Sequence, residues 1–397
     1  MTTDFLPERL MERARGDTGL SNFGADDFRE PLAVLCASLD REAPLSAAGR
    51  DANAQRLVAA LSRRLTWQAW FDRYPEIAQE RIAAPVVIVG LPRTGTTMLY
   101  RMLSSASAFA APLFYEVIGA PPPLDWDFRR ESDPRIPAAR TIVAAMMAAM
   151  PDLASIYPFE AEAPEESIFL YAPSFRSTSE HSNALVPGFA DWFRDADKRP
   201  AYAYLKRMLQ LLQWLRRKAG GFGEGQRWLL KTPDHIHGLD ALFAVFPDAR
   251  IIQTHRDPLQ TIPSICSFIR VLQRPAASRD TATEIGRAWS DLFAGGMTRA
   301  LAVRARHEEA FLDIRYEDTV ARADEVATQV FAFLGEALDE TGRAEMERWR
   351  EANRRDGRPA HRYSLAEFGL SESGIETDFA AYRERFIVTR GSADGAA

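Results

Sequence analysis

The chain has 397 residues, and its shares of hydrophobic residues (46%) and charged residues (26%) are those of an ordinary globular protein. Its 55 acidic residues outnumber its 49 lysines and arginines, and the resulting net charge of −6 excludes the basic surface that nucleic-acid binding requires. The two cysteines, Cys36 and Cys266, have no metal-ligand spacing, which excludes a disulfide framework and a zinc site.

The N-terminal part of the chain carries a helical pattern. Its first residues lack the apolar core of a signal peptide, and no apolar run of about 18 residues occurs anywhere in the chain. We therefore expect a cytoplasmic protein without an integral membrane segment. Residues 1–80 show helical periodicity, strongest over 28–39 and 50–74, and no strand pattern. They are expected to form a helical extension packed on the core.

A buried strand, a glycine-bounded loop and a helix follow one another between Pro85 and Leu103. Residues 86–89 are β-branched and apolar, which is typical of a strand buried on both faces of a parallel sheet. The loop over residues 90–97, with the sequence GLPRTGTT, leads directly into a helical pattern. Such a layout directs backbone N–H groups and a helix N-terminus at an anion.

The loop has the spacing of a nucleotide P-loop, but Thr96 stands where the lysine should be. A nucleoside triphosphatase needs that lysine on its phosphates, so its absence argues against triphosphate hydrolysis. Positive charge appears instead at Arg93, and Thr94 and Thr97 add further hydroxyl groups. We expect a site for a phosphate or sulfate group that needs no metal. The less specific alternative is a buried strand with a tight turn.

Residues 110–117 predict a short second strand that ends at Glu116. Because ligands bind at the carboxyl edge of a parallel sheet, Glu116 is a candidate general base. The alternative is a surface or structural glutamate.

The middle of the chain is predicted to be mostly helical, with helices over residues 137–150, 163–170 and 202–218. The pair Glu165 and Glu166 is expected on a solvated helix face. The aromatic segment 171–199 either forms a lid or wall for a substrate or is a plain packed loop.

The pattern from residue 227 to residue 264 predicts strand, helix, strand and helix, which is a βαβα unit with parallel strands. Lys231 closes the first of these strands and Arg256 follows the second, so both are expected at the edge that carries the anion loop. Two cations there predict a second anion subsite. A lysine in a buried strand also needs an anionic partner, unless it is solvated at the strand end.

Residues 311–315 predict a further strand, and the helix after it ends before Gly335, a typical residue beyond a helix C-terminus. The fold class is therefore α/β, with a P-loop-like central parallel sheet flanked by helices. We expect the core domain over residues 81–386 and a disordered tail over residues 387–397.

The whole chain resembles bacterial sulfotransferases that use 3′-phosphoadenosine 5′-phosphosulfate (PAPS), in the branch whose sulfate loop reads LPRTGTT, here residues 91–97. The segment Arg315-Tyr316-Glu317-Asp318 is also similar to a family segment. By this resemblance, Arg256 and Ser264 bind the 3′-phosphate, and Lys231 contacts the transferring sulfuryl group. The 5′-phosphosulfate is bound by the loop residues Pro92, Arg93, Thr94, Gly95, Thr96 and Thr97, of which Arg93 also counts as catalytic.

The chain departs from the family pattern at the general base. Many members have a histidine after the lysine and threonine of this segment, where this chain has Pro233. His235 lies two residues farther on. In members with an arginine in the loop, the resemblance implies a glutamate beyond the first helix, which here is Glu116. We expect Glu116 to be the base, with His235 as the second candidate.

The resemblance implies transfer of a sulfuryl group from PAPS to a hydroxyl or amine of a small acceptor, without a metal. The aromatic segment and the acidic net charge favour an apolar, phenolic or lipid acceptor over a polyanionic sugar. We expect no nucleic-acid partner, and the sequence is compatible with a homo-oligomer.

Two other functions compete with this one. A P-loop kinase or phosphotransferase would need the Walker lysine and a Mg²⁺-binding carboxylate at a strand end, and Thr96 stands against it. An inactive nucleotide-binding scaffold would keep the fold but lose the reacting groups. The joint presence of Arg93, Lys231, Arg256 and Ser264 argues against the scaffold.

Overall fold

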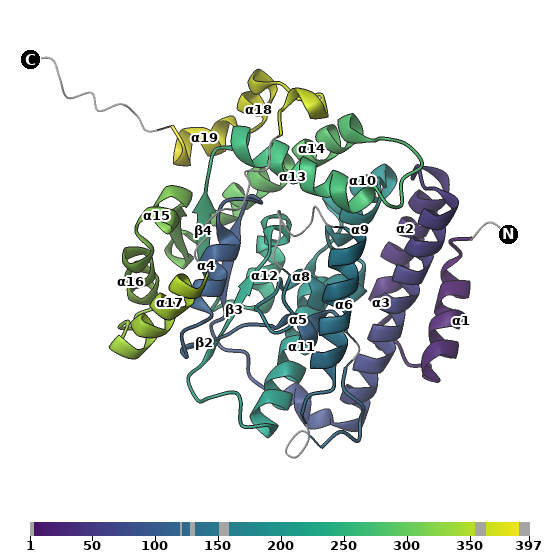
Figure 1. Cartoon of the computed structure of the whole chain (residues 1–397), viewed down its shortest axis with the longest axis horizontal. Coiled ribbons are helices and arrows are strands. Elements are labelled where there is room, and N and C mark those ends of the chain that lie inside the picture. Colours follow the sequence, from purple (N-terminus) through teal and green to yellow (C-terminus); the bar gives the residue numbers. More distant parts are fainter. Residues whose placement is uncertain (1–3, 120, 128–131, 151–158, 354–362, 389–397) are drawn as a thin grey trace, which may run out of the picture.

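A computed structural model describes residues 4–119, 121–127, 132–150, 159–353 and 363–388 of the chain. Its centre is a sheet of five parallel strands in the order β2-β3-β1-β4-β5, surrounded by helices (Figure 1). This architecture confirms the α/β class with a central parallel sheet, and four of the five strands are those that the sequence predicts. The strands are β1 (Val86–Gly90), β2 (Phe109–Ala110), β3 (Arg227–Lys231), β4 (Arg250–His255) and β5 (Phe311–Arg315).

Helices make up most of the remaining described chain. None of the helices in the described ranges is long and apolar enough to cross a membrane. The helices are α1 (Pro7–Thr18), α2 (Arg29–Arg41), α3 (Ala47–Arg73), α4 (Thr96–Leu103), α5 (Phe114–Val117), α6 (Arg135–Ala149), α8 (Ile168–Tyr171), α9 (Ser179–Asn183), α10 (Pro187–Asp195), α11 (Arg199–Lys218), α12 (Leu239–Val245), α13 (Pro258–Gln273), α14 (Ala282–Arg304), α15 (Tyr316–Ala321), α16 (Ala323–Phe333), α17 (Glu340–Ala352), α18 (Glu372–Asp378) and α19 (Ala380–Phe386).

Strand β1 lies in the middle of the sheet and is buried along its whole length. Successive side chains of a strand point to opposite faces. Val87 and Val89 accordingly belong to the larger apolar core, while Val86 and Ile88 belong to the core on the other face. After β1 the chain forms β2 and β3 on one side of it and then crosses to form β4 on the other side. The carboxyl end of β1 is therefore the switch point at which open α/β sheets bind ligands.

The three N-terminal helices lie side by side along one flank of the molecule (Figure 1). Their apolar faces form a separate core that also contains Phe175, Phe189 and Phe193. The aromatic segment 171–199 thus holds α9 and α10, and its large side chains are packed against the N-terminal helices. The proposed division at residues 80 and 81 stays a prediction, and residues 389–397 of the expected tail lie outside the described ranges.

The expected strand over residues 110–117 is wrong. Strand β2 ends at Ala110, and Glu116 lies in the short helix α5. Two local features explain the difference. Pro112 has no N–H to donate to a strand, and the Glu116 carboxylate accepts a hydrogen bond from the backbone N–H of Leu113 at 2.9 Å, which closes a helical turn.

The expected helix over residues 163–170 is largely wrong as well, because α8 begins only at Ile168. The preceding residues pair with the chain around Leu113 through an isolated antiparallel bridge at Pro164. The N–H of Glu165 donates to the carbonyl of Pro112 at 2.9 Å. Glu165 is consequently buried and Glu166 points toward the sheet edge, so neither lies on a solvated helix face.

Candidate functional site

The loop between β1 and α4 is held in a conformation that few side chains allow. Gly95 precedes α4 with φ +80°, and Arg93 has φ +69°, a value that residues with a Cβ rarely adopt. Gly90 packs closely against β4, since a Cβ there would lie 2.3 Å from Thr254 Oγ1 and 2.7 Å from the Thr254 carbonyl oxygen. The loop therefore follows a tight path at the carboxyl end of β1.

The loop threonines have different surroundings. The Thr94 hydroxyl is buried, donates to the carbonyl of Leu91 at 2.7 Å and lies 2.6 Å from Thr254 Oγ1, so it holds the loop in shape. Thr96 is also buried, at the first position of α4. The hydroxyl of Thr97 instead faces the sheet edge and accepts a hydrogen bond from Lys231 Nζ at 3.3 Å.

Lys231 is the central cation of the site. Its side chain is 1% exposed, and its Nζ donates to Glu166 Oε1 at 2.6 Å. A buried ammonium needs such a partner, because its desolvation is otherwise strongly unfavourable. Glu166 keeps 19% of its side-chain surface exposed, and its second oxygen makes no hydrogen bond within the described chain. The pair thus links the anion loop to a carboxylate that solvent can reach.

The position of Glu166 beside Lys231 was not expected, because the pattern over residues 163–170 looked helical. A local sign was available at the Ala163-Pro164 pair, since the residue before a proline avoids the helical region. The contact itself joins residues 65 positions apart in the chain, which local patterns do not report.

His235 supports the segment that carries Glu166. Its Nε2 lies 3.0 Å from the Ser167 hydroxyl, and its Nδ1 lies 2.8 Å from the Tyr202 hydroxyl. The backbone N–H of Ser167 donates to the carbonyl of Lys231 at 3.1 Å. Burial lowers the pKa of His235 to about 3, so the ring is neutral at physiological pH. With both nitrogens engaged, the ring has no free position for a substrate proton.

Glu116 is placed in a different ion pair. Arg216 donates from Nε to Glu116 Oε1 at 2.9 Å and from Nη2 to Oε2, which also accepts the N–H of Leu113. The Glu116 side chain is only 2% exposed. These contacts tie α5 to α11. Each oxygen of the Glu116 carboxylate accepts at least one of these hydrogen bonds. The base role expected for Glu116 stays a prediction.

Arg256 connects the anion loop to a second part of the site. Its Nη1 donates to the carbonyl of Arg93 at 3.0 Å, and its guanidinium carbon lies 4.1 Å from the centre of the Tyr316 ring. Its Nε donates to Gln260 on α13 at 2.9 Å. Ser264 lies farther along the same helix and is nearly buried. Arg256 thus links the anion loop to the beginning of α13, and its predicted role at an anion subsite stays a prediction.

A cavity of about 600 Å³ opens beside Arg256. One wall comes from α13 and the other from the C-terminal segment that begins at Tyr363. This volume and the guanidinium group of Arg256 in its lining suit a nucleotide-sized anion. The residues that line it are Arg256, Leu259, Gln260, Pro263, Tyr363, Ser364, Leu365, Ala366, Leu370 and Glu372.

Within the described ranges, no group of three or more histidine, cysteine, aspartate or glutamate side chains could hold a metal ion.

Comparison with known proteins places this geometry in context. A family model described as "Sulfotransferase family" matches residues 85–340. The structure is similar to that of sulfotransferase STF1 from Mycobacterium tuberculosis H37Rv, with a TM-score of 0.82, 30% identity and coverage of 94% of this chain and 98% of that chain. Sulfotransferase STF9 from Mycobacterium avium has a TM-score of 0.85 at 28% identity, with coverage of 98% of both chains. No curated protein matches the sequence.

The close approach at Gly90 gives a first prediction. Gly90→Ala should lower the free energy of unfolding by about 1–3 kcal/mol, because the added methyl group meets backbone atoms that cannot move aside. Gly16→Ala is the control, since a Cβ at Gly16 meets no atom within 4 Å. Denaturant unfolding of the two variants measures the difference. Equal free energies of unfolding for the two variants would show that the structure accommodates a methyl group at residue 90.

Burial of His235 gives a second prediction. Its pKa is about 3 in the folded protein against about 6.5 in an unfolded chain, so the unfolded state binds more protons between these values. Stability from this group is therefore lost as the pH falls from about 6.5 toward 3. In denaturant titrations between pH 4.5 and 6.5, His235→Gln should show a slope of unfolding free energy against pH that is shallower by up to about 1.4 kcal/mol per pH unit. Identical slopes would show that His235 titrates normally.

Proposed function

The chain belongs to the sulfotransferase family, and we propose that it transfers a sulfuryl group from PAPS to a hydroxyl or amine of a small acceptor. The observation that carries this proposal is the position of Lys231. Its ammonium lies between Thr97 of the anion loop and the carboxylate of Glu166. A donor group on the loop and an acceptor beside the carboxylate would then meet at one cation.

The donor would occupy the loop and the cavity beside Arg256. The N-terminus of α4 and the side chains of Arg93 and Thr97 suit the 5′-phosphosulfate. Arg256 and Ser264 suit the 3′-phosphate by their chemistry, because Arg256 contacts α13 through Gln260 and Ser264 belongs to the same helix. Pro92, Thr94, Gly95 and Thr96 would act mainly through the shape of the loop. PAPS supplies an activated sulfuryl group whose leaving group is adenosine 3′,5′-bisphosphate.

Lys231 would stabilise the charge that develops as this bond breaks. Sulfuryl transfer resembles phosphoryl transfer in its loose, in-line transition state, for which positioning and charge neutralisation matter most. The ammonium is buried, so its field is weakly screened at the point where the bridging oxygen gains charge. Arg93, in the loop itself, would add to this neutralisation.

Glu166 is the residue that we propose as general base. The acceptor oxygen forms its bond to sulfur, the bond from sulfur to the bridging oxygen breaks, and the acceptor proton passes to the Glu166 carboxylate. This carboxylate adjoins Lys231 and remains partly exposed. Glu116 and His235 are the alternatives from sequence, but both are buried with their polar atoms engaged.

The acceptor is proposed to be apolar. Residues 141–149 of α6 carry no charged side chain, and the helix buries only Arg135 and Ala139. The remaining apolar side chains pack partly on Phe114, Phe159 and Ala161. Because residue 161 belongs to the segment that leads to Glu166, we propose that this apolar surface forms the acceptor side of the site. An apolar alcohol or phenol would find both features together.

Nucleotide binding separates this function from its competitors. Calorimetric titration with adenosine 3′,5′-bisphosphate should show binding that does not change when Mg²⁺ is added. Binding of ATP that requires Mg²⁺ would support the kinase instead. If the protein binds adenosine 3′,5′-bisphosphate but labelled PAPS transfers no sulfuryl group to any of a panel of apolar alcohols, phenols and amines, the scaffold would be favoured.

The two glutamates are distinguished by paired variants. Glu166→Gln should lower kcat by about 10²–10⁴-fold while binding of adenosine 3′,5′-bisphosphate is kept, because the proton acceptor is lost. It should also lower the free energy of unfolding, because it removes the anionic partner of buried Lys231. Glu116→Gln should instead lower the free energy of unfolding by about 3 kcal/mol, since it leaves Arg216 without its charged partner. A stable Glu116→Gln protein that binds nucleotide but does not turn over would restore Glu116 as the base.

A further inference from the structure

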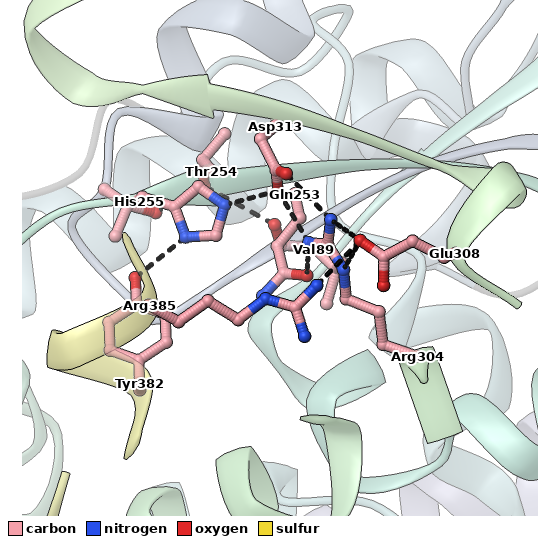
Figure 2. Close-up of polar contacts among 10 residues, drawn as sticks. Val89, Gln253, Thr254, His255, Arg304, Glu308, Asp313, Tyr382 and Arg385 are labelled. Atoms are coloured by element: carbon pink, nitrogen blue, oxygen red, sulfur yellow. Dashed lines mark hydrogen bonds and ion pairs between the residues drawn. The ribbon is translucent and has the colours of Figure 1, made fainter. Parts of the chain in front are cut away.

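The C-terminal helix α19 contacts the residues directly before and after Arg256 in the chain. This helix lies beyond the residues that the family model matches, 85–340. The Tyr382 hydroxyl lies 3.2 Å from His255 Nδ1, as Figure 2 shows. Tyr382 of α19 thus contacts the last residue of β4, directly before Arg256.

Arg383, the next residue of α19, holds the following position. Its Nε lies 3.2 Å from Asp257 Oδ1 and its Nη2 lies 3.2 Å from Oδ2, a two-point ion pair. Asp257 also caps α13, because its Oδ1 accepts the N–H of Leu259 at 3.0 Å. Arg383 therefore fixes the residue that begins the helix carrying Ser264.

The helix is itself held firmly on the sheet. The ring of Phe386 stacks on His255 with centroids 4.1 Å apart, and His255 Nε2 lies 2.7 Å from Asp313 on β5. Arg304 binds both Asp313 and Glu308, and Arg385 of α19 reaches the same glutamate at 2.7 Å (Figure 2). A short helix with so many directional contacts has one docking position.

We propose that α19 positions Arg256 for the 3′-phosphate of the donor, with Tyr382 and Arg383 as the positioning residues. The proposal rests on the proposed function, because Arg256 is assigned to the donor there. The physical reason is that an arginine at a strand end moves when its backbone moves. A hydrogen bond to a phosphate requires the guanidinium group to be placed within about 0.5 Å. The residues directly before and after Arg256 are both held by α19.

The same C-terminal segment completes the cavity beside Arg256. Tyr363, Leu365 and Leu370 line it opposite α13. The segment from residue 363 to residue 388 therefore both encloses the space for the nucleotide and holds the cation that faces it. A part of the chain outside the family match is thereby assigned to donor binding.

The test compares three variants of the full chain. Arg383→Met keeps the aliphatic stem but removes the ion pairs to Asp257 and Glu376. Tyr382→Phe keeps the ring but removes the hydroxyl. Arg385→Met is the matched control, because it removes an ion pair of the same helix with the half-exposed Glu308. Calorimetry with adenosine 3′,5′-bisphosphate measures the dissociation constant of each.

Arg383→Met and Tyr382→Phe should each weaken binding by about tenfold, while Arg385→Met should change it less than about twofold. With labelled PAPS, the KM for the donor should rise and kcat at saturation should stay within about twofold. If wild-type protein binds adenosine 3′,5′-bisphosphate and all three variants bind it equally well, the positioning role of α19 is refuted and the proposed function stands. If wild-type protein does not bind, both fail.

Hydrogen exchange of the free protein gives a readout that does not depend on nucleotide. The amides of Arg256 and Leu259 should exchange faster in Arg383→Met than in Arg385→Met, since only the former releases Asp257. Equal exchange in these two variants would also overturn the proposal, whatever their thermal stability.

Discussion

The site depends on the burial of one positive charge. Lys231 ends the strand next to β1, and its ammonium is almost fully removed from water. A charge in that position is tolerated only if anions or polar groups surround it. Thr97 supplies a hydroxyl from one side and Glu166 a carboxylate from the other. The need to compensate one ammonium thus brings the anion loop, β3 and the segment before α8 to a single point.

Around that point, the buried polar side chains have mainly structural tasks. His235 and Ser167 fix the segment that carries Glu166, and Arg216 with Glu116 ties α5 to α11. Thr94 shapes the loop through Thr254. Such contacts fix the backbone of the anion loop and of the segment that faces Lys231.

The sheet and most of the cations could be predicted from sequence, because their signals are local. A run of four β-branched residues marks β1, and Lys231 and Arg256 stand at the ends of strands whose pattern is equally plain. Glu166 and the surroundings of Glu116 could not be predicted, because antiparallel pairing at Pro164 and an ion pair across 100 residues decide them. The role of α19 was missed for the same reason: its contacts with residues 255–257 span over 120 positions.

The two edges of the sheet have a consequence for how the protein behaves at high concentration. Strand β2 is two residues long, so that edge offers little unpaired backbone to another chain. At the opposite edge, β5 carries Asp313 and Arg315 among its five residues, and Asp313 is held by Arg304 and His255. Charged or very short edge strands resist strand addition. The network that docks α19 therefore also protects an open sheet against edge-to-edge aggregation.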